Sequence, residues 1–172
     1  MTDMKPPCAI TIRPQMIKDA AAFYRILNEG NFDFFPVTVK SVEAEKRFLR
    51  QSRIHWQKQQ TWNFTIMLGS KVVGAIGIIP EKSRSYNAEI GYFIDREQHG
   101  HGFALQAAIQ VEQFALIFCP QIKRLQAFIV VENTPSIKVI EKAGYHKEGR
   151  LQSYLKCGDK YLDAYIYGKI IR

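Results

Sequence analysis

The spacing of apolar and polar side chains divides the first third of the chain into a strand and two helices. Residues 9–14 alternate apolar and polar side chains and end at a proline, which is the pattern of a strand. From Met16 the apolar residues recur at helical spacing until the Asn-Glu-Gly run at 28–30 ends the pattern. Ser41 is a suitable N-cap for a second helix, which continues to the polar run at 57–60.

Two strands joined by a tight turn come next. The runs 62–68 and 71–79 are rich in apolar and β-branched residues, and a Gly-Ser pair lies between them. Gly74 and Gly77 lie inside the second run. A strand residue without a side chain indicates close packing or a bulge rather than chemistry, so we expect these glycines to be structural.

The second half of the chain has the same patterns in a different order. A strand over 88–95 leads to a helix that begins near Gly102 and ends before Pro120. The later elements are a strand over 125–131, a short helix over 136–143 that ends at Gly144, and strands over 146–155 and 161–171. This order predicts a mixed α/β fold with a largely antiparallel sheet and one parallel crossover after the central strand.

The segment 87–116 joins the central strand to the following helix through a turn that contains Gly100 and Gly102. Glycines let backbone N–H groups approach an anion, and the first N–H groups of a helix have no partner within the helix. The helix dipole adds partial positive charge at the same place. Taken alone, the segment predicts either a binding site for a diphosphate or a simple turn.

Composition limits the class of protein. The 172 residues, 47% hydrophobic and 23% charged, fit one globular domain over 1–172 with a core of about 10–171. The net charge of +8 favours polyanionic partners, such as phosphorylated cofactors, ribosomal surfaces or nucleic acid, over a polycationic substrate, although a solvated basic surface has the same composition. The 3 cysteines are widely separated, which favours a reducing cytoplasm. The longest apolar run, 72–79, is too short to cross a bilayer, so we expect a soluble protein without a membrane partner.

Four stretches together resemble a known family. They are 73–77 (Val-Gly-Ala-Ile-Gly), 88–92 (Ala-Glu-Ile-Gly-Tyr), the turn 99–104, and 133–136 (Asn-Thr-Pro-Ser) continuing into 141–145. In this order the chain resembles a GNAT-superfamily N-acetyltransferase of the RimJ/RimL-like group. The resemblance implies an α/β fold with a mixed, largely antiparallel central sheet, helices on both faces and a splayed central strand pair. It also implies that acetyl-CoA is the co-substrate and that no metal is needed.

The resemblance also implies which residues hold acetyl-CoA. Aligning the family's Gln/Arg-x-x-Gly-x-Gly/Ala signature places His99 first, Gly102 fourth and Ala104 sixth, and His99 departs from the usual Gln or Arg. The remaining predicted contacts are Gly100, His101 and Phe103 in the turn, Tyr92, Phe93 and Ile94 at a splayed strand end that pairs with the pantetheine, and Asn133 at a later turn. His99 and His101 are not expected to bind a metal, because no third ligand lies nearby in the sequence.

The expected reaction requires a base and an acid. An amine must lose a proton before it attacks a thioester, and the leaving thiolate needs a proton. Glu89 is the leading candidate base and Asp163 a weaker one; the alternative for Glu89 is a strand carboxylate paired with a Lys or Arg. The family's usual tyrosine acid is replaced by Ile140, and Ser136 fits the donor position unless it is only a first-turn helix residue. A backbone N–H at a bulge of the central strand is expected to stabilise the oxyanion.

Three functions remain open at this point. The resemblance favours acetylation of a protein N-terminal amine, and acetylation of a small amine such as a polyamine, amino acid or antibiotic is the second candidate. The third is a non-catalytic module that binds acyl-CoA, a ribosome or RNA; a direct nucleic-acid contact is not expected, because basic residues do not interleave with the tyrosines of the last strand. Acceptor specificity is expected in the aromatic loop 32–36, the first two helices and the last hairpin. The sequence leaves the oligomeric state open, including a homodimer.

Overall fold

The computed structural model describes residues 9–29, 34 and 39–172, so the predicted aromatic loop 32–36 lies outside the described residues except for Phe34. The elements are β1 (Thr11–Pro14), η1 (Ile17–Asp19), α1 (Ala20–Glu29), α2 (Val42–Gln57), β2 (Trp62–Leu68), β3 (Lys71–Pro80), β4 (Asn87–Ile94), η2 (Arg96–Gln98), α3 (Phe103–Phe118), β5 (Arg124–Val130), α4 (Thr134–Lys142), β6 (His146–Cys157) and β7 (Lys160–Ile170). Every predicted helix and strand is present. The two short 3₁₀ turns are additions, and helix α4 begins earlier than expected because Asn133 caps it.

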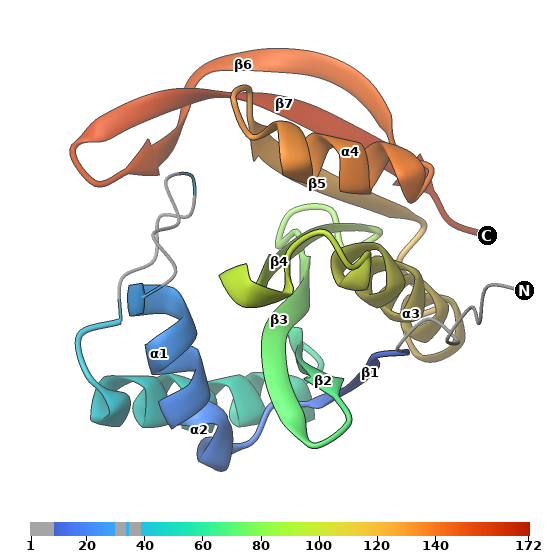
Figure 1. Ribbon diagram of the computed structural model, residues 1–172. Helices are drawn as coiled ribbons and strands as arrows, with labels where there is room; N and C mark the ends of the chain where they lie inside the picture. Colours follow the sequence, from blue (N-terminus) through green and yellow to red (C-terminus); the bar gives the residue numbers. More distant parts are fainter. Residues whose placement is uncertain (1–8, 30–33, 35–38) are drawn as a thin grey trace, which may run out of the picture.

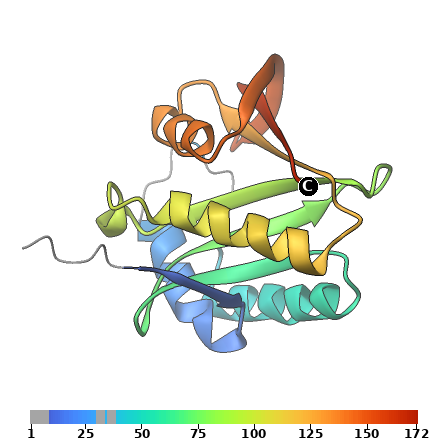
Figure 2. The same cartoon turned by 90° about the vertical axis from the view of Figure 1, so that its right-hand side faces the viewer.

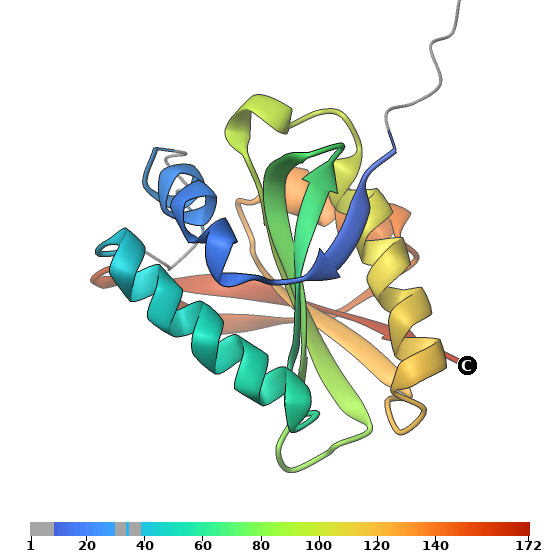
Figure 3. The same ribbon diagram turned by 90° about the horizontal axis from the view of Figure 1, so that it is seen from below.

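The strands form one sheet in the order β1-β2-β3-β4-β5-β7-β6 (Figure 1). All neighbouring pairs are antiparallel except β4 and β5, which confirms the predicted parallel crossover through α3. Helices α1 and α2 cover one face, and α3 and α4 cover the other (Figures 2 and 3). Among the described helices, none is long and apolar enough to cross a membrane.

The parallel strands β4 and β5 separate after a short paired segment. Their register contains only Asn87 with Arg124, Ala88 with Leu125, and Glu89 with Gln126. Beyond Glu89, strand β4 continues along β3, whereas β5 continues along β7. The predicted splay is therefore present, and it leaves one edge of the second half of β4 without a neighbouring strand.

Side chains alternate along β4 between the two faces of the sheet. Ala88, Ile90 and Ile94 belong to the main core, together with the buried side of α3. Phe93 points the other way and packs edge-to-face on Phe23 of α1, with ring centroids 5.7 Å apart. Because the side-chain period of a strand is two, Glu89 and Gly91 lie on the α1/α2 face and Tyr92 lies on the α3/α4 face.

Gly74 allows β3 and β4 to approach each other next to the splay. A Cβ atom at this position would overlap the carbonyl oxygen of Phe93. At Gly77 a Cβ atom would overlap the Asn63 side chain on β2. These two contacts confirm the prediction that both glycines serve close packing.

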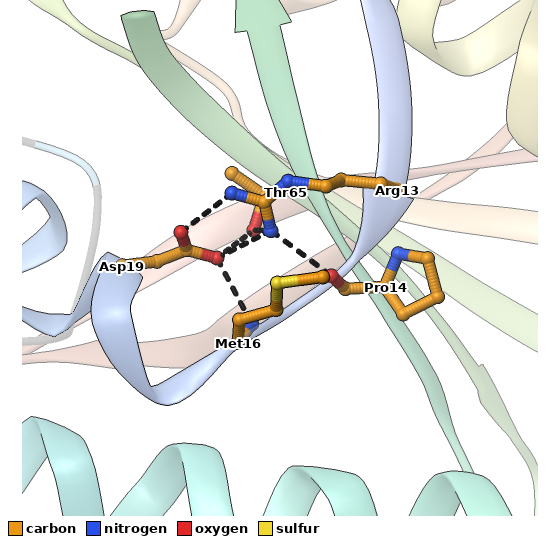
Figure 4. Close-up of polar contacts among 5 residues, drawn as sticks. All are labelled: Arg13, Pro14, Met16, Asp19 and Thr65. Carbon is orange, nitrogen blue, oxygen red and sulfur yellow. Dashed lines mark hydrogen bonds and ion pairs between the residues drawn. The ribbon is translucent and has the colours of Figure 1, made fainter. Parts of the chain in front are cut away.

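A buried ion pair between Arg13 and Asp19 connects the first elements of the chain (Figure 4). Asp19 is 2% exposed and accepts hydrogen bonds from Arg13 Nη1 at 2.8 Å and Nη2 at 2.6 Å, from Thr65 Oγ1 at 2.6 Å, and from the N–H of Met16 at 2.9 Å. These partners connect β1, η1 and β2. Burial acts to raise the pKa of Asp19, but the hydrogen bonds and the charge of Arg13 hold it below its usual value.

Candidate active site

The turn before α3 presents backbone donors at the start of a helix of 16 residues. Gly100 has φ = 80° and Gly102, the N-cap of α3, has φ = 75°, a left-handed conformation that glycine adopts without strain. A Cβ atom at either glycine would meet nothing within 4 Å, so the space beside the turn is open. Within the described chain, the N–H groups of residues 100–103 have no hydrogen-bond acceptor. Such a turn has the donors and the room that a diphosphate requires.

A hydrogen bond of the His99 side chain connects this turn to the end of β4. Its Nε2 lies 2.9 Å from the carbonyl oxygen of Ile94. A carbonyl only accepts, so Nε2 carries the proton. A hydrogen-bonding side chain is therefore retained at the position where the family has Gln or Arg. His101 stacks on Phe103 with ring centroids 5.4 Å apart and contacts the carbonyl of Gln98 through Nδ1.

Replacing Gly102 with alanine tests the turn. The left-handed backbone costs an L-residue about 1–2 kcal/mol, and the methyl group enters the space proposed for the diphosphate, so affinity for acetyl-CoA should fall at least about 10-fold. Gly158→Ala is a matched control, because Gly158 also has a positive φ and open space but lies in the β6–β7 turn. Calorimetric titration with CoA should show weaker binding for Gly102→Ala alone. Equal losses in both variants would contradict a role of this turn in binding.

The open edge of β4 is formed by alternate residues. The N–H of Asp95 donates to Val73 and the carbonyl of Asn87 accepts from Glu81, so odd-numbered residues of β4 turn their main-chain groups toward β3. Tyr92 and Ile94 therefore turn theirs toward the splay, whereas those of Phe93 face Ala75. Of the three strand residues predicted to pair with pantetheine, Tyr92 and Ile94 are oriented for it and Phe93 is not.

The predicted bulge on the central strand is absent. Strands β3 and β4 pair without a register shift from Gly74–Ile94 to Pro80–Ala88. A shift does occur between β2 and β3, at Ile66 and Met67. An oxyanion donor from β4 would instead be the N–H of Tyr92, which the regular alternation turns toward the splay.

Two hydroxyl groups meet on the α3/α4 side of the splay. The Tyr92 hydroxyl donates to the main-chain oxygen of Ser136 at 3.3 Å, across the space between β4 and α4. Burial raises the pKa of Tyr92 to about 12, with a hydrogen bond from the Ser136 side chain acting in the opposite direction, so the phenol stays protonated at neutral pH. Asn133 Oδ1 accepts from the N–H of Ser136 at 3.2 Å and so caps α4, which leaves the amide nitrogen of Asn133 as its group for a ligand.

The positions of Ile140 and Tyr145 explain why neither contributes an acid. Ile140 is 0% exposed and belongs to the main core. Tyr145, one residue beyond Gly144 (φ = 85°), is also buried in this core, and its hydroxyl has no hydrogen-bond partner in the described part of the chain.

Glu89 lies on the opposite face of β4 from Tyr92, at the last residue pair before the strands separate. It is half-buried, and among the described residues it has neither a salt bridge nor a hydrogen bond to its side chain. Burial raises the pKa of its carboxyl above the usual value. Two residues on, a Cβ atom at Gly91 would meet nothing within 4 Å, so the surface beside Glu89 is open. The candidate base and Ser136 therefore flank the splay from opposite faces.

The carboxylate of Asp163 is bound by residues of β6. Its carboxylate accepts from Arg150 Nη2 at 2.7 Å and from the N–H of Ser153 at 2.8 Å. The hydrogen bond from the Ser153 backbone, followed by that from Arg150, lowers its pKa. A carboxylate held in this way is a weak base, so the structure favours Glu89 over Asp163.

The sequence patterns alone did not indicate a role for the side chain of Tyr92 or the open position at Gly91. Alternation along β4 was the available signal, since it assigns each residue to a face once the core face is known.

A cavity of about 560 Å³ lies between α2 and the β1–β2 edge, lined in part by Gln15, Ser52 and Asn63. Strand β3 separates this cavity from β4, so we assign it no role in the chemistry.

Comparison with known proteins agrees with this geometry. Residues 9–146 match the family model of the acetyltransferase (GNAT) domain. The chain is 31% identical over 102 residues to the uncharacterized N-acetyltransferase p20 of Bacillus licheniformis, covering 59% of this chain and 57% of that protein. It is 26% identical over 140 residues to the ribosomal-protein-serine acetyltransferase of Escherichia coli, covering 80% and 76%. The structure of Mycobacterium smegmatis RimJ in complex with CoA-disulfide superposes with a TM-score of 0.84 at 25% identity, covering 95% of this chain and 83% of that one.

Proposed function

The chain belongs to the GNAT acetyltransferase family, and from this premise we propose that it acetylates a protein N-terminal α-amine with acetyl-CoA. The observation that carries the proposal is the splay between β4 and β5, which has an unpaired carboxylate on one face and hydroxyl groups on the other. A thioester carbonyl in this space would be reached by an amine from the Glu89 side, and its sulfur would leave toward Ser136.

Acetyl-CoA would be held by the turn and by the edge of β4. The N–H groups of residues 100–104 bind the diphosphate, supported by the dipole of α3. The carbonyl of Tyr92 and the N–H of Ile94 pair with the pantetheine amides, as an added strand would, and the N–H of Tyr92 is left for the oxyanion. The amide nitrogen of Asn133 supplies a further donor near the start of α4.

The proton transfers then follow from the two faces. Glu89 removes a proton from the acceptor ammonium through a water molecule, and the neutral nitrogen attacks the thioester carbonyl carbon. The N–H of Tyr92 stabilises the oxyanion. In the tetrahedral adduct the nitrogen is positively charged, and it loses its second proton to water. The carbon–sulfur bond breaks, the Ser136 hydroxyl gives its proton to the thiolate, and the proton released to water is returned to Ser136. Glu89 gives the first proton to the solvent. The products are an N-acetyl amide and CoA.

The choice of acceptor draws on similarity and charge. One relative acetylates a ribosomal-protein serine, as its name states, and the net charge of +8 suits association with a ribosome or a nascent chain. The same charge disfavours polyamines. We further propose that residues 1–172 act as one domain in the cytoplasm, where the two described cysteines, Cys119 and Cys157, remain free thiols as they are in the structure.

A panel of acceptors tests the proposal. The protein is incubated with acetyl-CoA, a thiol reagent and peptides that begin with serine, alanine or methionine, beside spermidine and free amino acids. The expected result is CoA release with peptides that have a free N-terminus and none with N-terminally blocked peptides. Release with small amines alone would indicate the small-molecule reaction. Thermal stabilisation by acetyl-CoA without release for any acceptor would indicate a binding module.

Replacing Ser136 with alanine should lower kcat about 10-fold without changing the affinity for CoA, because the hydroxyl acts only when the thiolate leaves. The loss is limited because a thiolate is already a good leaving group. In addition, the hydroxyl of Tyr92 lies beside Ser136 and can supply a proton in its place. Single-turnover measurements report this step. Ser83→Ala, in the exposed β3–β4 loop, is the control. An unchanged kcat for Ser136→Ala would exclude this role.

A further inference from the structure

An aromatic pair lies on the Glu89 face of the sheet. The ring of Phe128 in β5 and the ring of Tyr154 in β6 have centroids 4.8 Å apart at 35°. Phe128 lies on this face because it is two residues beyond Gln126, the partner of Glu89. Tyr154 is 49% exposed, so part of its ring is accessible. Burial, followed by the charges of Glu89 and Glu81, raises the pKa of Tyr154, which places both carboxylates in its electrostatic surroundings.

An irregularity in β6 brings Tyr154 to this position. Strand β6 pairs with β7 at Leu151–Ala164 and again at Leu155–Leu162. Between these two pairs the chain advances four residues along β6 but only two along β7. Leu162 lies on the same face as Phe128, and Leu155 beside it does too. In a regular strand Tyr154, the residue before Leu155, would point to the opposite face. The extra residues turn its ring back onto Phe128, as bulges commonly do.

The irregularity contains a strained residue that is held by a charged group. Ser153 has φ = 48°, a left-handed conformation that is unfavourable for a residue with a side chain. Its N–H donates to the Asp163 carboxylate at 2.8 Å, and Arg150 binds the same carboxylate. These charge-assisted hydrogen bonds offset the strain. Asp163 is therefore a positioning residue for the segment that carries Tyr154.

We propose that Tyr154 is a specificity-determining residue for the acceptor, and that its ring packs against the side chain of the residue that bears the amine. The role rests on the proposed function, since it takes acetyl transfer to occur at the splay. Three neighbouring features define the acceptor chemistry: the Glu89 carboxylate attracts an ammonium, the open space at Gly91 admits it, and the aromatic pair offers an apolar surface. An apolar or methylene-rich first residue is favoured, and an acidic first residue is repelled by Glu89.

Kinetics of the full chain with matched peptides test this role. The peptides differ only in the first residue, which is methionine, alanine or aspartate. For Tyr154→Ala we expect KM for the methionine peptide to rise about 10- to 100-fold, with a smaller change for the alanine peptide and no change in KM for acetyl-CoA. Tyr154→Phe keeps the ring and should retain the preference. Tyr161→Ala is the matched control, because Tyr161 is 62% exposed in the same hairpin on the opposite face, and it should behave as wild type.

The outcomes separate this role from the proposed function. Peptide acetylation with the same first-residue preference in Tyr154→Ala and wild type would overturn the role of Tyr154 and leave the proposed function intact. An equal loss for all peptides together with a raised KM for acetyl-CoA would also overturn it, since a specificity residue acts through the acceptor alone. Failure of the wild type to release CoA with any peptide would overturn the proposed function and this role together. Melting curves of each variant show whether the fold is retained.

Discussion

Glu89→Gln should lower kcat about 10²- to 10⁴-fold, the usual contribution of a general base, while affinity for acetyl-CoA stays the same. The amide has nearly the same shape but cannot take the proton from the acceptor ammonium. Because burial raises the pKa of Glu89, the wild-type enzyme should lose activity on acidification at a pH above the ordinary glutamate value of about 4.3. This acidic limb should disappear in the variant. CoA release measured across pH is the test.

The same substitution should raise stability at neutral pH. The pKa of Glu89 is higher in the folded state than in the unfolded state, so folding favours the protonated carboxyl. The contribution of Glu89 to the free energy of unfolding therefore declines as pH rises, and at pH 7 the ionised carboxylate destabilises the protein. Glutamine removes that cost, a trade between stability and activity that is common at active sites. Glu43→Gln, at an exposed residue of α2, is the control: it should leave the rate and the pH profile unchanged, and it should not raise stability, because it removes the ion pair with Lys46. An unchanged rate and pH profile in Glu89→Gln would eliminate Glu89 as the base.

Asp19→Ala should destabilise the protein by about 3–5 kcal/mol, because it leaves the guanidinium of Arg13 without its buried partner. The variant also loses the acceptor for Thr65 and for the N–H of Met16. Asp19→Asn keeps a polar group of the same shape and should lose less. Urea unfolding followed by tryptophan fluorescence measures the difference, and Asp159→Ala, in the exposed β6–β7 turn, should change stability by less than about 0.5 kcal/mol.

The pH dependence of this contribution has a defined sign. The folded-state pKa of Asp19 is lowered, so its stabilisation is present above the unfolded value of about 3.9 and is lost as pH falls through the folded value. The difference in stability between wild type and Asp19→Ala should therefore shrink on acidification below pH 4. A difference that stays constant down to pH 2 would show that the carboxylate charge contributes nothing.

The turn before α3 was predictable because its signals are local. Gly100 and Gly102 need positive φ, and the following apolar stripe fixes where α3 begins, so residues 99–104 could be assigned before any tertiary contact was known. The same holds for the cap at Ser41, whose side chain accepts from an N–H group three residues away. Such features depend on neighbouring residues in the sequence.

The surroundings of the carboxylates were not predictable from the sequence. Glu89 and Asp163 are both acidic residues on apolar strands, yet Asp163 is bound by Arg150 and Ser153, whereas Glu89 has no such partner among the residues that the structure describes. A pKa shift depends on burial and on charges that come from distant parts of the chain. The expected bulge on β4 failed for a similar reason, because a register shift is a property of two strands and not of one.

The order of the elements, the turn before α3, the candidate residues and the resemblance to the family all follow from local sequence patterns. Which of the candidate residues lie beside the same opening in the sheet depends on the fold. The splay exists because β5 leaves β4 to pair with β7, and Glu89 lies on one of its faces and Ser136 of α4 on the other. Tyr154 reaches Phe128 because Asp163 holds a strained serine in β6. Periodicity along one segment indicates which way a side chain points, but what it meets there depends on the register of strands that are far apart in the chain.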